Sequence, residues 1–207
     1  MIHTGLADVS ALVEEQSYQY YYHSVPKFRQ EKADKLHEQQ DKALSVGAWI
    51  LLQKMRKQYG LEETASFNLS HSGKYALCSI DDSGKEMQVG CDIEEIKQSK
   101  LSVAERFFCE SEYQYILRQP SEKEQIEAFY RYWVLKESFM KATRLGMKLG
   151  MNQFEIEIKE GAILKRIPED IRGDYHFREY SVKDIPYRIA VCSDCNQFSE
   201  EIHPVIL

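Results

Sequence analysis

The sequence predicts an α+β protein built from two similar halves. Helical spacing over residues 28–59 is followed by strand patterns over residues 67–93, and a second helical stretch that ends at Leu145 is followed by further strand patterns. The segment Tyr75–Ser79 also resembles the segment Ile189–Ser193. Similar strands at comparable places suit a duplicated fold with a cleft between the copies, although chance similarity of two strands explains the match as well.

The division between the halves is expected at residue 100, which gives an N-terminal α+β half over residues 1–100 and a C-terminal α+β half over residues 101–207. In the first half, the turn residues 81–85 lie between two strand-like runs and predict a hairpin. No Pro/Gly-rich linker marks the division.

The second half is expected to begin with helices and to end in strands. Ser111, with Gln114 three residues later, has the capping-box pattern of a helix start. Strand patterns follow over residues 154–158, 162–166, 175–182 and 187–192.

Composition excludes several classes of protein. The 207 residues carry 27 basic and 33 acidic side chains, so the net charge of −6 provides no global attraction for nucleic acid or for an anionic membrane. The N-terminus has no basic head followed by an apolar run, and we expect a cytoplasmic protein. The five cysteines are odd in number and scattered, which suits a reducing compartment.

Two carboxylates share one face of a predicted strand. In the run from Val89 to Glu94, strand alternation places Gly90, Asp92 and Glu94 together. Neighbouring carboxylates repel each other unless a cation lies between them, and oxygen ligands suit magnesium. A solvated strand end explains this pattern equally well.

A third carboxylate interrupts an apolar helix stripe. Glu137 follows Phe129, Tyr130 and Trp133 at helical spacing, and burying a carboxylate is unfavourable unless it meets a metal or a base. Lys136 and Lys141 flank it. The alternative is an exposed Glu137 that pairs with Lys141 on the helix surface.

A polar cluster begins the strand-like run of the first half. Backbone amides near Gly73, the hydroxyls of Ser70 and Ser72 and the ring of His71 suit phosphate oxygens. A turn capped by its own side chains is the alternative.

One ligand that carries phosphates and magnesium explains all three patterns together. The ordered segments FNLSHSGKY, VGCDIEEI, RFFCESEY and WVLKESFMKA closely resemble those of the Sfp-type 4'-phosphopantetheinyl transferases. The two most specific motifs are Gly90-x-Asp92-x-Glu94 and Trp133-x-x-Lys136-Glu137-Ser138-x-x-Lys141. The resemblance extends over roughly residues 28–195.

The resemblance implies a pseudo-twofold α+β monomer with coenzyme A bound in the cleft between its halves. Each half is expected to look like one subunit of the smaller holo-[acyl-carrier-protein] synthases. By position, Asp92, Glu94 and Glu137 would hold Mg²⁺. Lys136 and Lys141 would neutralise phosphate oxygens. The residues expected to contact coenzyme A are His71, Ser70, Arg29, Lys32 and Ser45.

The implied reaction is the transfer of the phosphopantetheine arm of coenzyme A to a serine of an apo acyl or peptidyl carrier protein. The leaving group is 3',5'-adenosine diphosphate, and Glu137 is the candidate base. A non-catalytic coenzyme A binding regulator and a metal-dependent phosphohydrolase are the alternatives. No nucleic acid and no membrane partner is expected.

Overall fold

The computed structural model describes residues 1–98 and 100–207, and it divides the chain into two compact units. Unit 1 consists of residues Met1–Glu86 and Ser199–Leu207, and unit 2 of residues Met87–Phe198. This division differs from the expected one at residue 100 because the strand β4 (Val89–Glu95) pairs with β8 (Tyr187–Ser193), far along the chain. The last residues return to unit 1.

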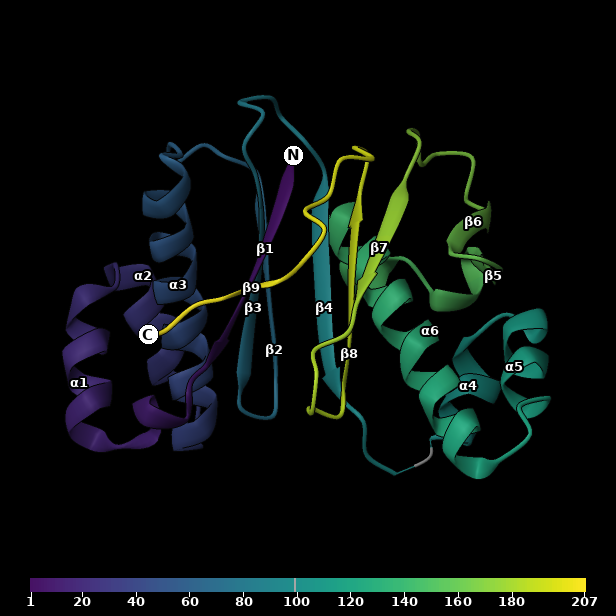
Figure 1. The fold of residues 1–207 in the computed structure, drawn as a ribbon, viewed down its shortest axis with the longest axis horizontal. Helices are drawn as coiled ribbons and strands as arrows, with labels where there is room; N and C mark the ends of the chain where they lie inside the picture. The colour runs from purple at the N-terminus through teal and green to yellow at the C-terminus, as the bar shows by residue number, and fades with distance from the viewer. Residues whose placement is uncertain (99) are drawn as a thin grey trace. The chain divides into compact units, whose positions relative to one another are not determined.

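Unit 1 is a four-stranded sheet with helices on it (Figure 1). The strand order is β2-β3-β1-β9, and β3 is antiparallel to both of its neighbours. The long helix α3 packs on this sheet. The elements are β1 (Ile2–Asp8), a 3-10 turn (Ser10–Val13), α1 (Glu15–Ser24), α2 (Lys27–Asp34), α3 (Gln39–Tyr59), β2 (Phe67–Ser72), β3 (Tyr75–Asp81) and β9 (His203–Pro204).

Helix α3 forms where the apolar spacing predicts it. Its buried side chains Leu44, Leu51 and Met55 recur at helical intervals and pack on the sheet. The helix ends at Gly60, whose φ of 64° lies in the left-handed region that a residue without Cβ adopts readily.

Unit 2 is a three-stranded antiparallel sheet, of order β4-β8-β7, with the long helix α6 packed against β4 and β8 (Figure 1). A second, two-stranded sheet consists of β5 and β6. The remaining elements are α4 (Leu101–Phe107), α5 (Glu110–Leu117), α6 (Glu122–Ala142), 3-10 turns (Gly146–Lys148 and Met151–Gln153), β5 (Glu155–Ile158), β6 (Ala162–Arg166) and β7 (His176–Tyr180). None of the helices within residues 1–98 and 100–207 combines the length and the apolar character needed to cross a bilayer.

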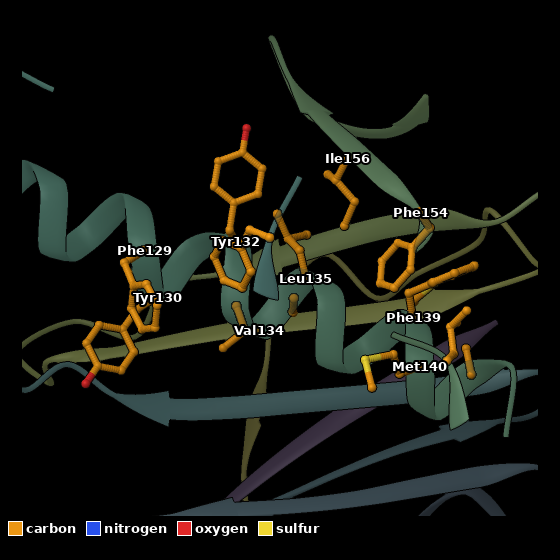
Figure 2. Packing of buried hydrophobic residues seen from close by; sticks show 14 of the residues in the cluster. Phe129, Tyr130, Tyr132, Val134, Leu135, Phe139, Met140, Phe154 and Ile156 are labelled. Carbon is orange, nitrogen blue, oxygen red and sulfur yellow. The ribbon is translucent and has the colours of Figure 1, made fainter. Parts of the chain in front are cut away.

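Helix α6 is the centre of the core of unit 2. It begins after Ser121, whose hydroxyl accepts a hydrogen bond from the amide of Glu124, and it ends at Ala142, three residues before the predicted end. Aromatic side chains surround it, and Phe139 packs against Phe154 with ring centroids 4.7 Å apart (Figure 2). A helix buried on several sides is held in a defined orientation, which matters for the polar side chains it carries.

Four elements occur in the same order in both units, which supports the duplicated fold. Each contains a strand, a 21-residue helix, an edge strand and finally a central strand that is antiparallel to both neighbours. The similar segments Tyr75–Ser79 and Ile189–Ser193 lie in these central strands, β3 and β8. The predicted α+β class is confirmed, and the cleft between the halves remains a prediction.

Two local predictions are wrong. The hairpin consists of β2 and β3 around Gly73, whose φ is 58°, whereas β4 pairs with β8. Turn chemistry shows where a chain reverses, but it does not choose between a local and a distant partner strand. The capping box of α5 is formed by Cys109 and Glu112, two residues before the predicted one.

Candidate active site

The Gly90-x-Asp92 motif brings β4 against the backbone of α6. A Cβ placed on Gly90 would overlap with the carbonyl oxygen of Ser138 and with the amide nitrogen of Ala142. Glycine therefore permits the close approach of strand and helix. Because side chains alternate along a strand, Asp92 also faces α6.

Lys141 of α6 forms an ion pair with Asp92. Its Nζ lies 2.6 Å from Oδ1 of Asp92 and donates a further hydrogen bond to the carbonyl of Cys91 at 3.2 Å. The Asp92 side chain is only 5% exposed. Burial is the largest single influence and acts to lower the pKa of Lys141, but the charge and hydrogen bond of Asp92, together with the charges of Cys91 and Glu137, outweigh it and the pKa is raised. The ammonium group is therefore fixed in its charged form.

Glu137 lies one helical turn before Lys141 and is half-buried. Burial raises its pKa, and the charge of Asp92 raises it further, while Lys141 acts in the opposite direction. Glu137 makes no hydrogen bond or ion pair with the residues that the structure describes. The alternative in which an exposed Glu137 pairs with Lys141 is therefore wrong, because Lys141 pairs with Asp92.

The chemistry of these carboxylates fits a hard cation. The charge of Asp92 disfavours the ionised form of Glu137, and a divalent cation would relieve that repulsion. Glu94 lies on the same face of β4 as Asp92. In the described part of the chain, however, no three His, Cys, Asp or Glu side chains are gathered closely enough to hold a metal. The set Asp92, Glu94 and Glu137 thus stays a predicted magnesium site.

Lys136 lies apart from this cluster. It is fully buried, and its Nζ forms an ion pair with Glu112 of α5 at 2.8 Å. Burial lowers the pKa of Lys136 and raises that of Glu112, and each charge offsets part of that effect on the other. The placement of Lys136 does not support the predicted phosphate contact. Sequence analysis missed Glu112, although the displaced capping-box pattern pointed to this helix start.

Two neighbouring cations lie on α2 of unit 1, of which Arg29 is buried and Lys32 is exposed. Arg29 is 9% exposed and lies over the ring of Trp49, 4.9 Å from its centroid. Burial lowers the pKa of Arg29. The pKa of Lys32 is lowered mainly by burial and, to a smaller extent, by the charge of Arg29. Neither cation has an acidic partner among the described residues. Two such neighbours are suited to binding an anion.

The remaining predicted contacts of unit 1 lie on different faces. The buried hydroxyl of Ser45 has no hydrogen-bond partner within the described residues, and it lies one turn before Trp49 on α3. His71 is exposed. It lies on the same face of β2 as Phe67, which packs against the core around α3. Ser70 is buried on the opposite face, so the structure separates it from the other predicted ligands.

Comparison with known proteins identifies the class. The sequence model of one protein family, the 4'-phosphopantetheinyl transferase superfamily, matches residues 88–192 of the chain. These residues include Asp92, Glu137 and Lys141. The match spans just over half of the chain. The chain belongs to this superfamily.

Individual relatives agree with the resemblance seen in the motifs. The chain is 41% identical over 128 residues to the 4'-phosphopantetheinyl transferase psf-1 of Bacillus pumilus, covering 61% of this chain and 52% of that protein. It is 34% identical over 139 residues to the 4'-phosphopantetheinyl transferase Sfp of Bacillus subtilis (strain 168), covering 67% and 59%. The predicted similarity to Sfp-type transferases is confirmed. The chain spans about half the length of these curated relatives.

Proposed function

We propose that the chain transfers the phosphopantetheine arm of coenzyme A to a serine of an apo acyl or peptidyl carrier protein. The observation that carries this proposal is the Asp92–Lys141 ion pair beside the half-buried Glu137, within the region that matches the superfamily. Attack of a hydroxyl on a phosphate requires a cation to neutralise the phosphate oxygens and a group that accepts the proton, and a fixed ammonium group with neighbouring carboxylates can supply both.

The reaction forms a bond between the serine oxygen and the β-phosphorus of coenzyme A. The bond from that phosphorus to the bridging oxygen breaks, and 3',5'-adenosine diphosphate leaves. Lys141 neutralises the charge that develops on the phosphate oxygens. Glu137 accepts the serine proton, a role that its raised pKa favours.

Magnesium bound by Asp92, Glu94 and Glu137 would neutralise charge on the pyrophosphate. Glu137 cannot be a free base and a metal ligand with the same lone pair, so the two roles compete. Without the metal, the ammonium group of Lys141 pairs with Asp92 and balances its charge.

In unit 1, the 3'-phosphate of coenzyme A is assigned to Arg29, Lys32 and Ser45, with His71 toward the nucleotide phosphates. The buried guanidinium of Arg29, the neighbouring Lys32 and the buried hydroxyl of Ser45 support this assignment. The active-site cleft between the halves, a monomeric state, a cytoplasmic location and the absence of nucleic-acid and membrane partners are further parts of the proposal.

The Arg29→Gln substitution is expected to raise KM for coenzyme A about tenfold while kcat changes less than threefold, because a phosphate contact of this kind exists before and during transfer. Dephospho-coenzyme A, which lacks the 3'-phosphate, should show no such change. Lys27→Gln is the matched control, since Lys27 lies on the same helix with an 88% exposed side chain. If the ratio of KM for coenzyme A to KM for dephospho-coenzyme A is the same in Arg29→Gln as in the wild type, Arg29 does not contact the 3'-phosphate.

Release of 3',5'-adenosine diphosphate distinguishes the proposed transferase from its alternatives. The protein is incubated with coenzyme A and magnesium, with and without an apo carrier domain. A transferase releases the nucleotide only when the carrier is present. A phosphohydrolase releases it without the carrier, and a binding regulator releases none, so either result would refute the proposal.

A further inference from the structure

The buried ion pair of Lys136 and Glu112 joins three segments of unit 2. Besides Glu112, the Nζ of Lys136 donates to the carbonyl oxygens of Met151 at 2.8 Å and of Phe154 at 3.1 Å. An ammonium group has three hydrogens, and these three contacts use all of them. Lys136 therefore has no donor left for a phosphate oxygen.

Both carboxylate oxygens of Glu112 are also engaged. One carboxylate oxygen accepts from Lys136 and from the amide of Cys109, and the other accepts from the amide of Ile156, each at 2.8 Å. The pair thus ties α6 to the start of α5 and to the chain that begins β5. Phe154 packs against Phe139 of α6 (Figure 2). The Nζ of Lys136 lies 4.3 Å from the centroid of the Phe154 ring.

The position of Lys136 on α6 relates the pair to the site. With 3.6 residues per turn, Ser138 and Ala142, which contact Gly90, lie about 200–240° around the helix from Lys136. Glu137 and Lys141 lie about 100–140° around from it, in the sector between these two contacts. The helix is therefore held on opposite sides, by β4 and by the ion pair.

We propose that Lys136 and Glu112 are positioning residues, which fix the rotation of α6 that presents Glu137 and Lys141 to Asp92. A buried ion pair adds little stability, because apolar residues of similar size often stabilise a core as well. Directional hydrogen bonds that engage all three hydrogens of Lys136 and both oxygens of Glu112, in contrast, specify one orientation of the helix. This inference rests on the proposed transferase function. It explains why a lysine in a phosphate-binding motif lies buried away from the site.

A double-mutant cycle tests the proposal. Lys136→Met and Glu112→Gln are each expected to lower kcat at least tenfold, with KM for coenzyme A within threefold, because substrate is bound but misaligned groups react slowly. The double variant, which carries neither charge and so avoids an unpaired buried ion, is expected to match the slower single variant rather than to fall further. Assays are run below the unfolding transition of every variant.

Arg131→Met is the matched control, because Arg131 lies on the same helix and forms a two-pronged ion pair with Glu179 of β7, at 2.6 and 2.7 Å. It should lower the unfolding temperature while kcat stays within threefold of the wild-type value. Wild-type kcat in Glu112→Gln, together with a slow Lys136→Met, would overturn the proposal by showing that Lys136 acts directly. Equal losses in Arg131→Met, or full activity in the double variant, would also overturn it.

Hydrogen exchange gives a readout that does not need activity. The amides of Cys109 and Ile156 should exchange faster in Lys136→Met, because their acceptor loses its fixed position. If the wild-type protein transfers nothing, the proposed function fails while this measurement still tests the ion pair. Unchanged exchange at both amides would contradict the positioning role itself.

Discussion

Asp92→Asn is expected to lower transfer by about two to three orders of magnitude while the chain stays folded. The substitution keeps the shape of the side chain but removes the charge that holds Lys141 and that would bind magnesium. Steady-state transfer rates across a magnesium titration, with thermal unfolding as the check on folding, measure the effect.

Glu95→Gln is the control for Asp92→Asn. Glu95 is on the same strand but on its opposite face, where it pairs with Lys97 at 3.0 Å. Its substitution should leave the rate unchanged. A wild-type rate and magnesium affinity in Asp92→Asn would show that Asp92 is no part of the site.

Glu137→Gln is expected to lower transfer by about two to four orders of magnitude, because it removes the candidate base and a metal ligand together. Titrating magnesium separates the two roles. A rate that recovers at high magnesium indicates a ligand, whereas a rate that stays low indicates a base. Glu127→Gln is the control, since Glu127 lies on the same helix and binds Arg188 at 2.8 Å.

The same substitution has a predicted effect on stability. Because burial raises the pKa of Glu137 above its ordinary value of 4.5, ionising it at neutral pH lowers the free energy of unfolding. Without magnesium, Glu137→Gln should therefore unfold at a higher temperature than the wild type at pH 7. The difference should disappear below about pH 4.5, where Glu137 is protonated in both states. Two results would contradict these predictions: a Glu137→Gln protein that is less stable than the wild type at neutral pH, or one that transfers at the wild-type rate at limiting magnesium. Either result would show that Glu137 is an ordinary helix residue.

Elements with strong periodicity were predictable, and elements defined by distant pairing were not. The apolar spacing indicated α3 and α6, and the strand patterns indicated β5 to β8. The first strand, β1, was missed. It contains Gly5 and Ala7, which are poor strand formers, and it becomes a strand through its pairing with β3.

The candidate site shows the same limit. Alternation along β4 correctly placed Gly90 and Asp92 on one face, and that face meets α6. The partner of a charged side chain cannot be deduced from its own helix. Lys141 pairs with Asp92 of another element instead of Glu137, and Lys136 pairs with Glu112. The motif therefore predicted the same phosphate-binding role for Lys136 and Lys141, although of the two only Lys141 lies beside Asp92.

The intact mass of an apo carrier domain tests the central claim most directly. The carrier is incubated with coenzyme A, magnesium and the full chain, and peptide mapping locates any modification. The proposed transfer predicts a mass increase of one phosphopantetheine group on a single serine, and none when Asp92→Asn replaces the wild-type protein. An unchanged mass in both acyl and peptidyl carriers, with the protein folded and coenzyme A present, would contradict it.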